Sequence, residues 1–249
     1  MNTITRAIVM DLYTRKARLY PPLLAAMPVA ITAAALYPAG LTPWTAAWGL
    51  LTWAGVTYLL AQFGGERGKD LEPWLFQQWG GKPTTVRLRH RDSANPALLA
   101  RYHRRLQSLV PDQRLPSAAE EAANADAADQ IYDAAVALLR NRTRDRNAFP
   151  LVFDHLCSYG FRRNLWGLKP VGLLSNVASL AVIAIVQIGG RRWSIEPVAA
   201  TVVTATVIDA LFLMAWLRIT PNWVRRAADN YADSLLESCD AAEPARSES

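Results

Sequence analysis

The sequence predicts an all-α integral membrane protein: two transmembrane helical hairpins, four spans in all, with a mostly helical cytoplasmic domain inserted between spans 2 and 3. Residues 19 to 65 form a run of 47 residues without Asp, Glu, Lys or Arg. Residues 170 to 190 form a second uncharged run. The chain is 51% hydrophobic, yet its mean hydropathy is only +0.05, as expected when apolar spans alternate with polar segments.

The first hairpin is predicted over residues 19 to 63, with spans at Tyr20 to Leu36 and Trp44 to Phe63. A bilayer core about 30 Å thick needs roughly 20 apolar residues in a helix, so the uncharged run is long enough to cross twice. Thr42 is a suitable cap for the second helix, and Pro43 suits its first turn. A helical hairpin buried in a soluble core is the less favoured alternative, because so short a chain rarely buries so long a run.

Residues 1 to 18 are predicted to form a basic interfacial segment that lies along the membrane surface. Its apolar residues Ile4, Ile8 and Leu12 share one helical face, and the basic residues that follow are typical headgroup anchors. Within the first span, Pro28 predicts a kink, since proline removes a backbone hydrogen bond.

The second hairpin is predicted over residues 168 to 217, with spans at Leu168 to Ile188 and about Ile195 to Leu217. A short turn at Gly189 to Arg192 connects them. Residues 218 to 249 are predicted to form a juxtamembrane helix followed by a polar tail.

The insert domain is predicted over residues 64 to 167. Capping and proline signals predict three helices in it: Pro96 to Leu109, Ser117 to about Thr143, and Phe149 to Tyr159. Apolar and polar residues alternate briefly from Thr85 to His90, and this pattern favours an edge strand or extended arm.

The distribution of basic residues predicts the orientation. Outside the spans, 4 Lys and Arg precede the first span, 17 lie between the second and third, 2 between the third and fourth, and 4 follow the last. Because positive residues remain in the cytoplasm, both termini and the insert are expected there, in a multi-pass protein of the bacterial inner membrane.

Asp209 is the most informative single residue, because an ionisable side chain deep in a span normally faces a bundle interior or water. One interpretation places it on an ion path. The expected pore-lining residues are Asp209, Thr201, Thr204, Thr206 and Asn176. The alternative is an interhelical hydrogen bond from Asp209 to Ser175, Asn176 or Ser179.

A basic segment in the insert is the second candidate site. Its expected ligand-binding residues are Lys82, Arg87, Arg89, Arg91, Arg101, Arg104 and Arg105. Arginine forks suit phosphate oxygens, which favours a negatively charged ligand. Two alternatives stay open: attraction to anionic lipid headgroups, and internal pairing with the acids between Ser117 and Asp133.

Enzymatic, metal and cofactor signatures are missing from the sequence. Gly81-Lys82 is followed by Pro83 rather than Ser or Thr, so a Walker phosphate loop is excluded. The three histidines are scattered, and Cys157 and Cys239 are expected to be free thiols. We therefore expect neither catalysis nor a bound cofactor or metal.

Several segments resemble a family of uncharacterised bacterial four-span membrane proteins. These segments are Trp74, Trp79 to Thr85, Leu88 to Asp92, Asn95-Pro96, Arg101 to Arg104, Tyr132 to Asp145 and Phe149 to Pro170. In architecture and charge the chain also resembles channel-type effectors of anti-phage defence, with Hailong membrane effectors the nearest analogue. The resemblance implies a cytoplasmic domain that senses a nucleotide, an oligonucleotide or single-stranded nucleic acid.

The expected function is therefore an oligomeric ion channel or pore effector in the bilayer, gated when the basic insert binds a nucleotide or oligonucleotide signal. Four thin spans cannot enclose a water path alone, so we expect a homo-oligomeric ring, for example a tetramer. A partner enzyme would make the ligand. The alternative is a non-conducting membrane scaffold whose insert recruits a partner protein or anionic lipid.

Overall fold

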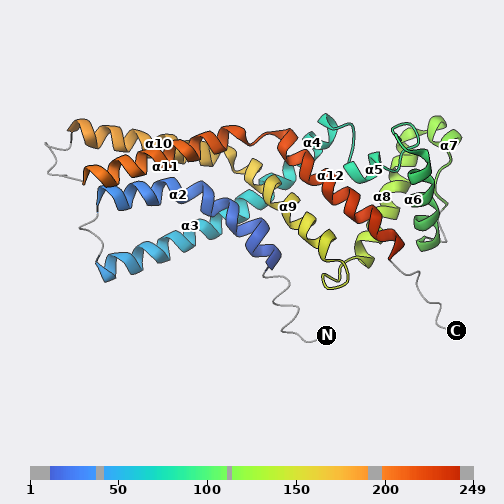
Figure 1. The fold of residues 1–249 in the computed structure, drawn as a ribbon, viewed down its shortest axis with the longest axis horizontal. Coiled ribbons are helices and arrows are strands. Elements are labelled where there is room, and N and C mark those ends of the chain that lie inside the picture. The colour runs from blue at the N-terminus through green and yellow to red at the C-terminus, as the bar shows by residue number, and fades with distance from the viewer. Residues whose placement is uncertain (1–11, 38–41, 111–113, 190–197, 242–249) are drawn as a thin grey trace. The chain divides into compact units, whose positions relative to one another are not determined.

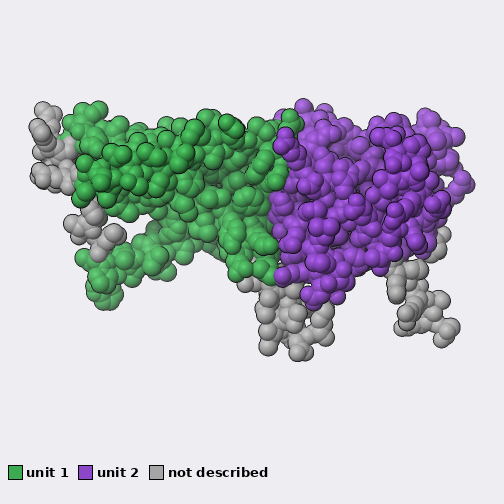
Figure 2. Space-filling model, viewed as in Figure 1, with its two compact units in different colours: residues 1–71, 160–224 green, residues 72–159, 225–249 purple. Residues whose placement is uncertain are grey.

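The computed structural model describes residues 12–37, 42–110, 114–189 and 198–241, and the regular secondary structure in these ranges is entirely helical (Figure 1). The chain divides into two compact units, coloured separately in Figure 2. Unit 1 comprises residues 1–71 and 160–224, and unit 2 comprises residues 72–159 and 225–249. Unlike the predicted insert, unit 2 includes the end of the chain, because Leu235 and Leu236 are fully buried in its core.

Unit 1 contains the helices that are long and apolar enough to cross a bilayer; within the described ranges there are three. They are Thr14–Leu36, formed by the π-helix η1 (Thr14–Leu19) and α2 (Tyr20–Leu36), then α10 (Lys169–Gly189) and α11 (Ala199–Arg218). They agree closely with the predicted first, third and fourth spans, and Pro28 lies inside α2. The protein is therefore a helical protein of membrane type. Of the interfacial segment predicted over residues 1 to 18, residues 1–11 lie outside the described residues, and Thr14 onward is continuous with the first candidate span. Residues 38–41 and 190–197, which include most of the predicted turn at Gly189 to Arg192, also lie outside the described residues.

Helix α3 (Pro43–Asp70) covers the predicted second span. Thr42 caps it through a capping box, and Pro43 occupies its first turn, as predicted. Its tryptophans, threonines and glycines make it less apolar than the three other helices, so this span stays a prediction. The N-terminal half of α3 lies apart from α2 (Figure 1) and exposes large apolar side chains. These are Trp44, Trp48, Leu50, Leu51 and Val56.

Helices α2, α10 and α11 pack against one another in unit 1. Ala25, Leu173 and Trp216 belong to one apolar cluster, whereas Ala35, Ile183 and Val202 belong to another. The order of these residues makes α2 parallel to α10 and antiparallel to α11. The Trp216 ring packs directly on the backbone of Gly172, where an added Cβ would lie 2.3 Å from the ring.

Unit 2 is built from shorter helices around its own core. The helices that lie wholly within it are α4 (Glu72–Gln78), α5 (Pro83–Val86), α6 (Pro96–Leu109), α7 (Ala118–Ala123), α8 (Ala125–Arg142) and the 3₁₀ turn η4 (Ser238–Asp240). Helices α9 (Pro150–Gly167) and α12 (Pro221–Glu237) contribute residues to both units. Leu99, Tyr102, Leu106 and Leu109 lie at helical spacing on the buried face of α6, which explains why that segment folds as a helix.

Of three local predictions for the insert, the structure confirms one, confirms another in part and contradicts the third. Asn95 caps the helix that ends at Leu109, as predicted. Ser117 forms its predicted capping box, but the helix ends at Ala123, and Asn124 caps a second one. The extended segment predicted at Thr85 to His90 is wrong: Pro83 begins the short helix α5, and turns follow it.

Candidate functional site

Asp209 lies within the interior of the unit 1 bundle. It is the eleventh of the 20 residues of α11 and is 0% exposed. The Thr32 hydroxyl on α2 donates a hydrogen bond of 2.9 Å to its Oδ2. The predicted interhelical hydrogen bond therefore exists, but its donor is Thr32 rather than Ser175, Asn176 or Ser179.

Two further polar residues on α10 are buried at the corresponding level of the bundle. Asn176 is 0% exposed and Ser179 is 3% exposed. Along α10 they lie between Leu173 and Ile183, just as Asp209 lies between Val202 and Trp216 on α11. We call Thr32, Asn176, Ser179 and Asp209 the polar layer, because two apolar clusters of the bundle border it.

Most of the polar layer lacks hydrogen-bond partners. Asp209 Oδ1, Ser179 Oγ and both amide atoms of Asn176 are buried without a partner among the described residues. Leaving a buried polar atom unsatisfied costs about 1–3 kcal/mol, so four such atoms in one bundle require a physical reason. Their oxygens are hard ligands of the kind that small cations and water prefer.

Helix α2 contains a proline, Pro28, one turn before Thr32 of this layer. Pro28 has no N–H, and Ser175 Oγ donates a hydrogen bond of 2.5 Å to the carbonyl oxygen of Ala25 one turn earlier. In apolar surroundings, Ser and Thr side chains commonly satisfy backbone groups near a proline. Ser175 therefore links α10 to the backbone of α2 and donates no hydrogen bond to Asp209 in this structure.

The threonines predicted to line a pore with Asp209 are located differently. Thr204 and Thr206 each donate to a carbonyl oxygen of α11 four residues earlier. Thr201 donates to the carbonyl oxygens of Val198, the N-cap residue of α11, and of Ala35 on α2. Thr201 and Thr204 are exposed on the single chain, whereas Asp209 is enclosed. The structure thus brings Asn176 and Asp209 into one layer and leaves the two exposed threonines outside it. Sequence reasoning missed Thr32, because a lone threonine in an apolar span carries no signal of its own.

The basic segment of unit 2 is largely neutralised by carboxylates of the same unit. Arg87 binds Asp229 at 3.0 Å and also Asp233, both on α12. Arg89 is 7% exposed and binds both oxygens of Asp129, at 2.8 and 2.5 Å. These hydrogen bonds keep the pKa of Arg89 above its usual value, although burial opposes them. The internal pairing that the sequence left open is therefore present.

Four other cations of the segment also have partners. Lys82 binds Asp133, Arg91 binds Glu121 and Asp129, and both Arg101 and Arg105 bind Asp240. Of the seven predicted ligand-binding residues, Arg104 alone has no charged partner in the ranges that the structure describes. The surface has less free charge than the sequence suggested.

Glu121 organises the buried end of this network. It is 2% exposed and accepts hydrogen bonds from the His90 and Arg91 backbones and from the Tyr132 hydroxyl. Burial favours the neutral acid, but these hydrogen bonds and the Arg91 guanidinium hold the pKa of Glu121 below its usual value. Glu121 is therefore a buried anion that orders the turn after α5.

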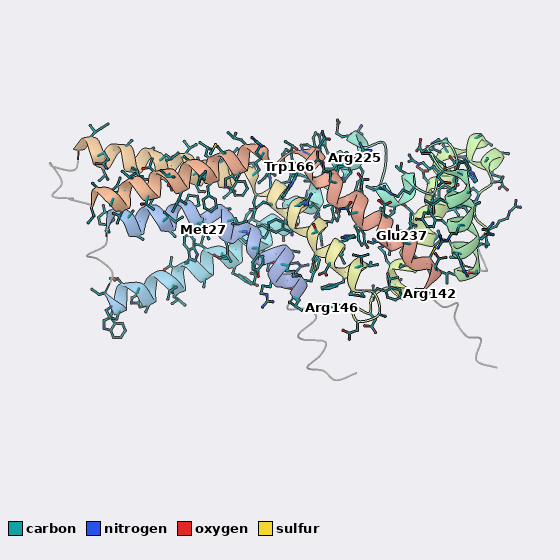
Figure 3. All side chains as sticks on the ribbon, viewed as in Figure 1. Met27, Arg142, Arg146, Trp166, Arg225 and Glu237 are labelled. Carbon is teal, nitrogen blue, oxygen red and sulfur yellow. The ribbon has the colours of Figure 1, made fainter. Side chains whose placement is uncertain are left out.

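Two of the four arginines near the end of α8 contact other groups of unit 2. Figure 3 labels Arg142 and Arg146. Arg142 donates to the carbonyl oxygen of Leu109 at 3.2 Å, and the Arg146 guanidinium lies 5.2 Å from the centre of the Phe153 ring. Arg140 and Arg144 are exposed.

Within the described residues, no group of three or more His, Cys, Asp or Glu side chains is placed to hold a metal ion. Cys157 and Cys239 are both buried and free. No family model, curated protein or solved structure matched this chain, so the family resemblance stays a prediction.

Proposed function

We propose that the protein is the subunit of an ion channel of the bacterial inner membrane, in which the polar layer binds a small monovalent cation. The observation that carries this proposal is the fully buried Asp209, which has a single hydrogen bond, an unsatisfied Oδ1, and three further unsatisfied polar atoms in the same layer. An ionisable group at mid-membrane costs about 2.5–3.5 kcal/mol, so such groups usually mark ion or proton paths.

The charge of the layer determines the class of ion. Asp209 is its one ionisable residue, and the other ligands would be neutral hydroxyl and amide oxygens. A proton or a sodium ion would neutralise the layer, whereas a divalent ion would leave a net positive charge in an apolar bundle. The hydrogen bond from Thr32 would hold α11 against α2 in a closed state, and conduction would need these helices to separate.

The remaining parts of the proposed function concern assembly and control. The exposed tryptophans and leucines of α3 would be covered by lipid and by neighbouring subunits of a homo-oligomeric ring. Unit 2 would respond to a nucleotide-type ligand, and α9 provides a continuous helix shared by both units. A defence role and a partner enzyme that makes the ligand remain predictions from the resemblance alone.

Cation flux into liposomes tests the proposal. The full chain would be reconstituted, and flux of protons and sodium ions would be followed with fluorescent indicators. Asp209→Asn keeps the shape of the side chain but removes its charge, so flux should fall at least about tenfold. Thr204→Val is the matched control, because it removes a polar group from the exposed face of the same helix. Undiminished flux in Asp209→Asn, with protein of unchanged oligomeric size, would remove the case for the layer.

A second candidate function is a non-conducting scaffold that recruits a partner protein or lipid through unit 2. The observation that favours it is the extensive ion pairing of unit 2, which is what a folded interaction domain with its own core would need. A scaffold would show no flux above empty liposomes under any condition, and its oligomers would lack a central pore.

A further inference from the structure

Unit 2 contains a cavity of about 440 Å³ that no part of the ion path uses. Its walls come from α4, the start of α5, α8, α9 and α12, and all of the lining residues belong to unit 2. Pockets that bind small ligands usually measure about 300–1,000 Å³ and combine aromatic walls with a few polar groups. This cavity has both properties.

Cationic groups border one part of the cavity. Arg140 lines it and is exposed, and its guanidinium has no hydrogen-bond or ion-pair partner in the described ranges. Lys82 also lines it and is half exposed, paired with Asp133, which accepts a second hydrogen bond from Thr85. Arg140 is thus available to an anion, with Lys82 near enough to line the same space.

Aromatic side chains form another part of the wall. Phe76, Tyr159 and Tyr231 line the cavity, and the two tyrosine rings are nearly parallel, at 4°, with centres 6.4 Å apart. Beside them, Glu72 accepts a 2.7 Å hydrogen bond from the Tyr159 hydroxyl. Planar rings pack well on such surfaces, and a carboxylate at their edge can accept further N–H donors.

We propose that this cavity binds a nucleoside monophosphate. The base packs against the aromatic residues with its N–H groups toward Glu72, and the phosphate binds Arg140, assisted by Lys82. The proposal deepens the proposed function by naming the site and class of the ligand of unit 2, which differs from the basic segment predicted from the sequence. Because the test measures only binding, nucleotide binding can be disproved while ion conduction is observed, and conduction can be disproved while nucleotide binding is observed.

The test uses the full chain in detergent and measures binding by calorimetry and by the rise in unfolding temperature. The ligands are the adenosine, guanosine, cytidine and uridine monophosphates, with adenosine and inorganic phosphate as the two separate parts. At least one monophosphate should bind at least about tenfold more tightly than either part, since ring and anion contacts act together.

Three variants locate the site. Arg140→Gln should weaken binding about tenfold or more, and Ala134→Trp should abolish it by filling the cavity from an exposed position. Arg144→Gln, a nearby exposed arginine outside the cavity, should leave binding within about twofold. The proposal is overturned if no monophosphate binds, or if inorganic phosphate alone binds as tightly as the monophosphates. It is also overturned if folded Arg140→Gln and Ala134→Trp bind the monophosphate as tightly as the unaltered protein.

Discussion

Thr32 and Asp209 lie 177 positions apart in the sequence, yet the Thr32 hydroxyl donates a 2.9 Å hydrogen bond to the Asp209 carboxylate between α2 and α11. Both residues are buried, at 5% and 0% exposure. The bond joins the first and last of the three candidate membrane helices. It therefore sets the register of the bundle at the depth where the polar layer lies.

Thr32→Val should destabilise the bundle by about 1–2 kcal/mol, because the substitution keeps the shape and leaves Asp209 without its donor. The measurement is the free energy of unfolding in mixed detergent micelles. Thr204→Val should change it by less than about 0.5 kcal/mol, since that exposed hydroxyl contacts only its own helix. Equal effects of the two substitutions would contradict a special role for the Thr32 hydroxyl.

Arg87→Met should destabilise unit 2 by about 1–2 kcal/mol. The substitution leaves Asp229 and Asp233 as like charges one turn apart on α12, although their exposure of 30% and 50% moderates the cost. Thermal unfolding followed by circular dichroism measures the effect, which should shrink at high salt. Arg104→Met is the control, because Arg104 has no ion-pair partner in the described chain; a loss of the same size there would argue against the α12 pairing.

The stability of unit 2 should fall in acid partly because of Glu121. Its pKa is below the ordinary 4.5 in the folded protein. The contribution to stability is therefore present above about pH 4.5 and lost as the pH falls through the lower, folded value. Glu121→Gln should reduce stability at pH 7 and flatten the acid decline of the unfolding temperature. Glu237→Gln alters an exposed acid and is the control: its unfolding temperature should decline in acid as steeply as that of the wild type. If the unfolding temperature of Glu121→Gln also declined as steeply as that of the wild type, Glu121 would not be the stabilising buried anion.

Local signals in the sequence were sufficient to predict many of the helices and their ends. Caps at Thr42 and Asn95 depend on neighbours three residues away, so their prediction needed no tertiary information. The limits of α2 followed from its apolar composition. The second span was predicted from an uncharged run, but the tryptophans and threonines of α3 lower its hydropathy, which is why that span is the one left unsupported.

The partners of the site residues depend on long-range packing, and here sequence reasoning was incomplete. For the basic segment it considered only acids between Ser117 and Asp133, whereas Arg87 and Arg101 bind acids beyond residue 225. For Asp209, the predicted hydrogen-bond partners all lay on α10, whereas the observed donor Thr32 lies on α2. The donor on α2 could be identified only once the register of three helices was known.

The placement of Leu235 and Leu236 in the core of unit 2 has a consequence for biosynthesis. The ribosome makes residues 72–159 well before these two leucines, and both apolar helices α10 and α11 emerge in between. The core of the earlier segment, which includes Tyr132 and Leu106, therefore remains incomplete until α12 leaves the exit tunnel. Chains that stop before α12 should be recognised by chaperones and proteases, even though every candidate spanning helix has already been synthesised.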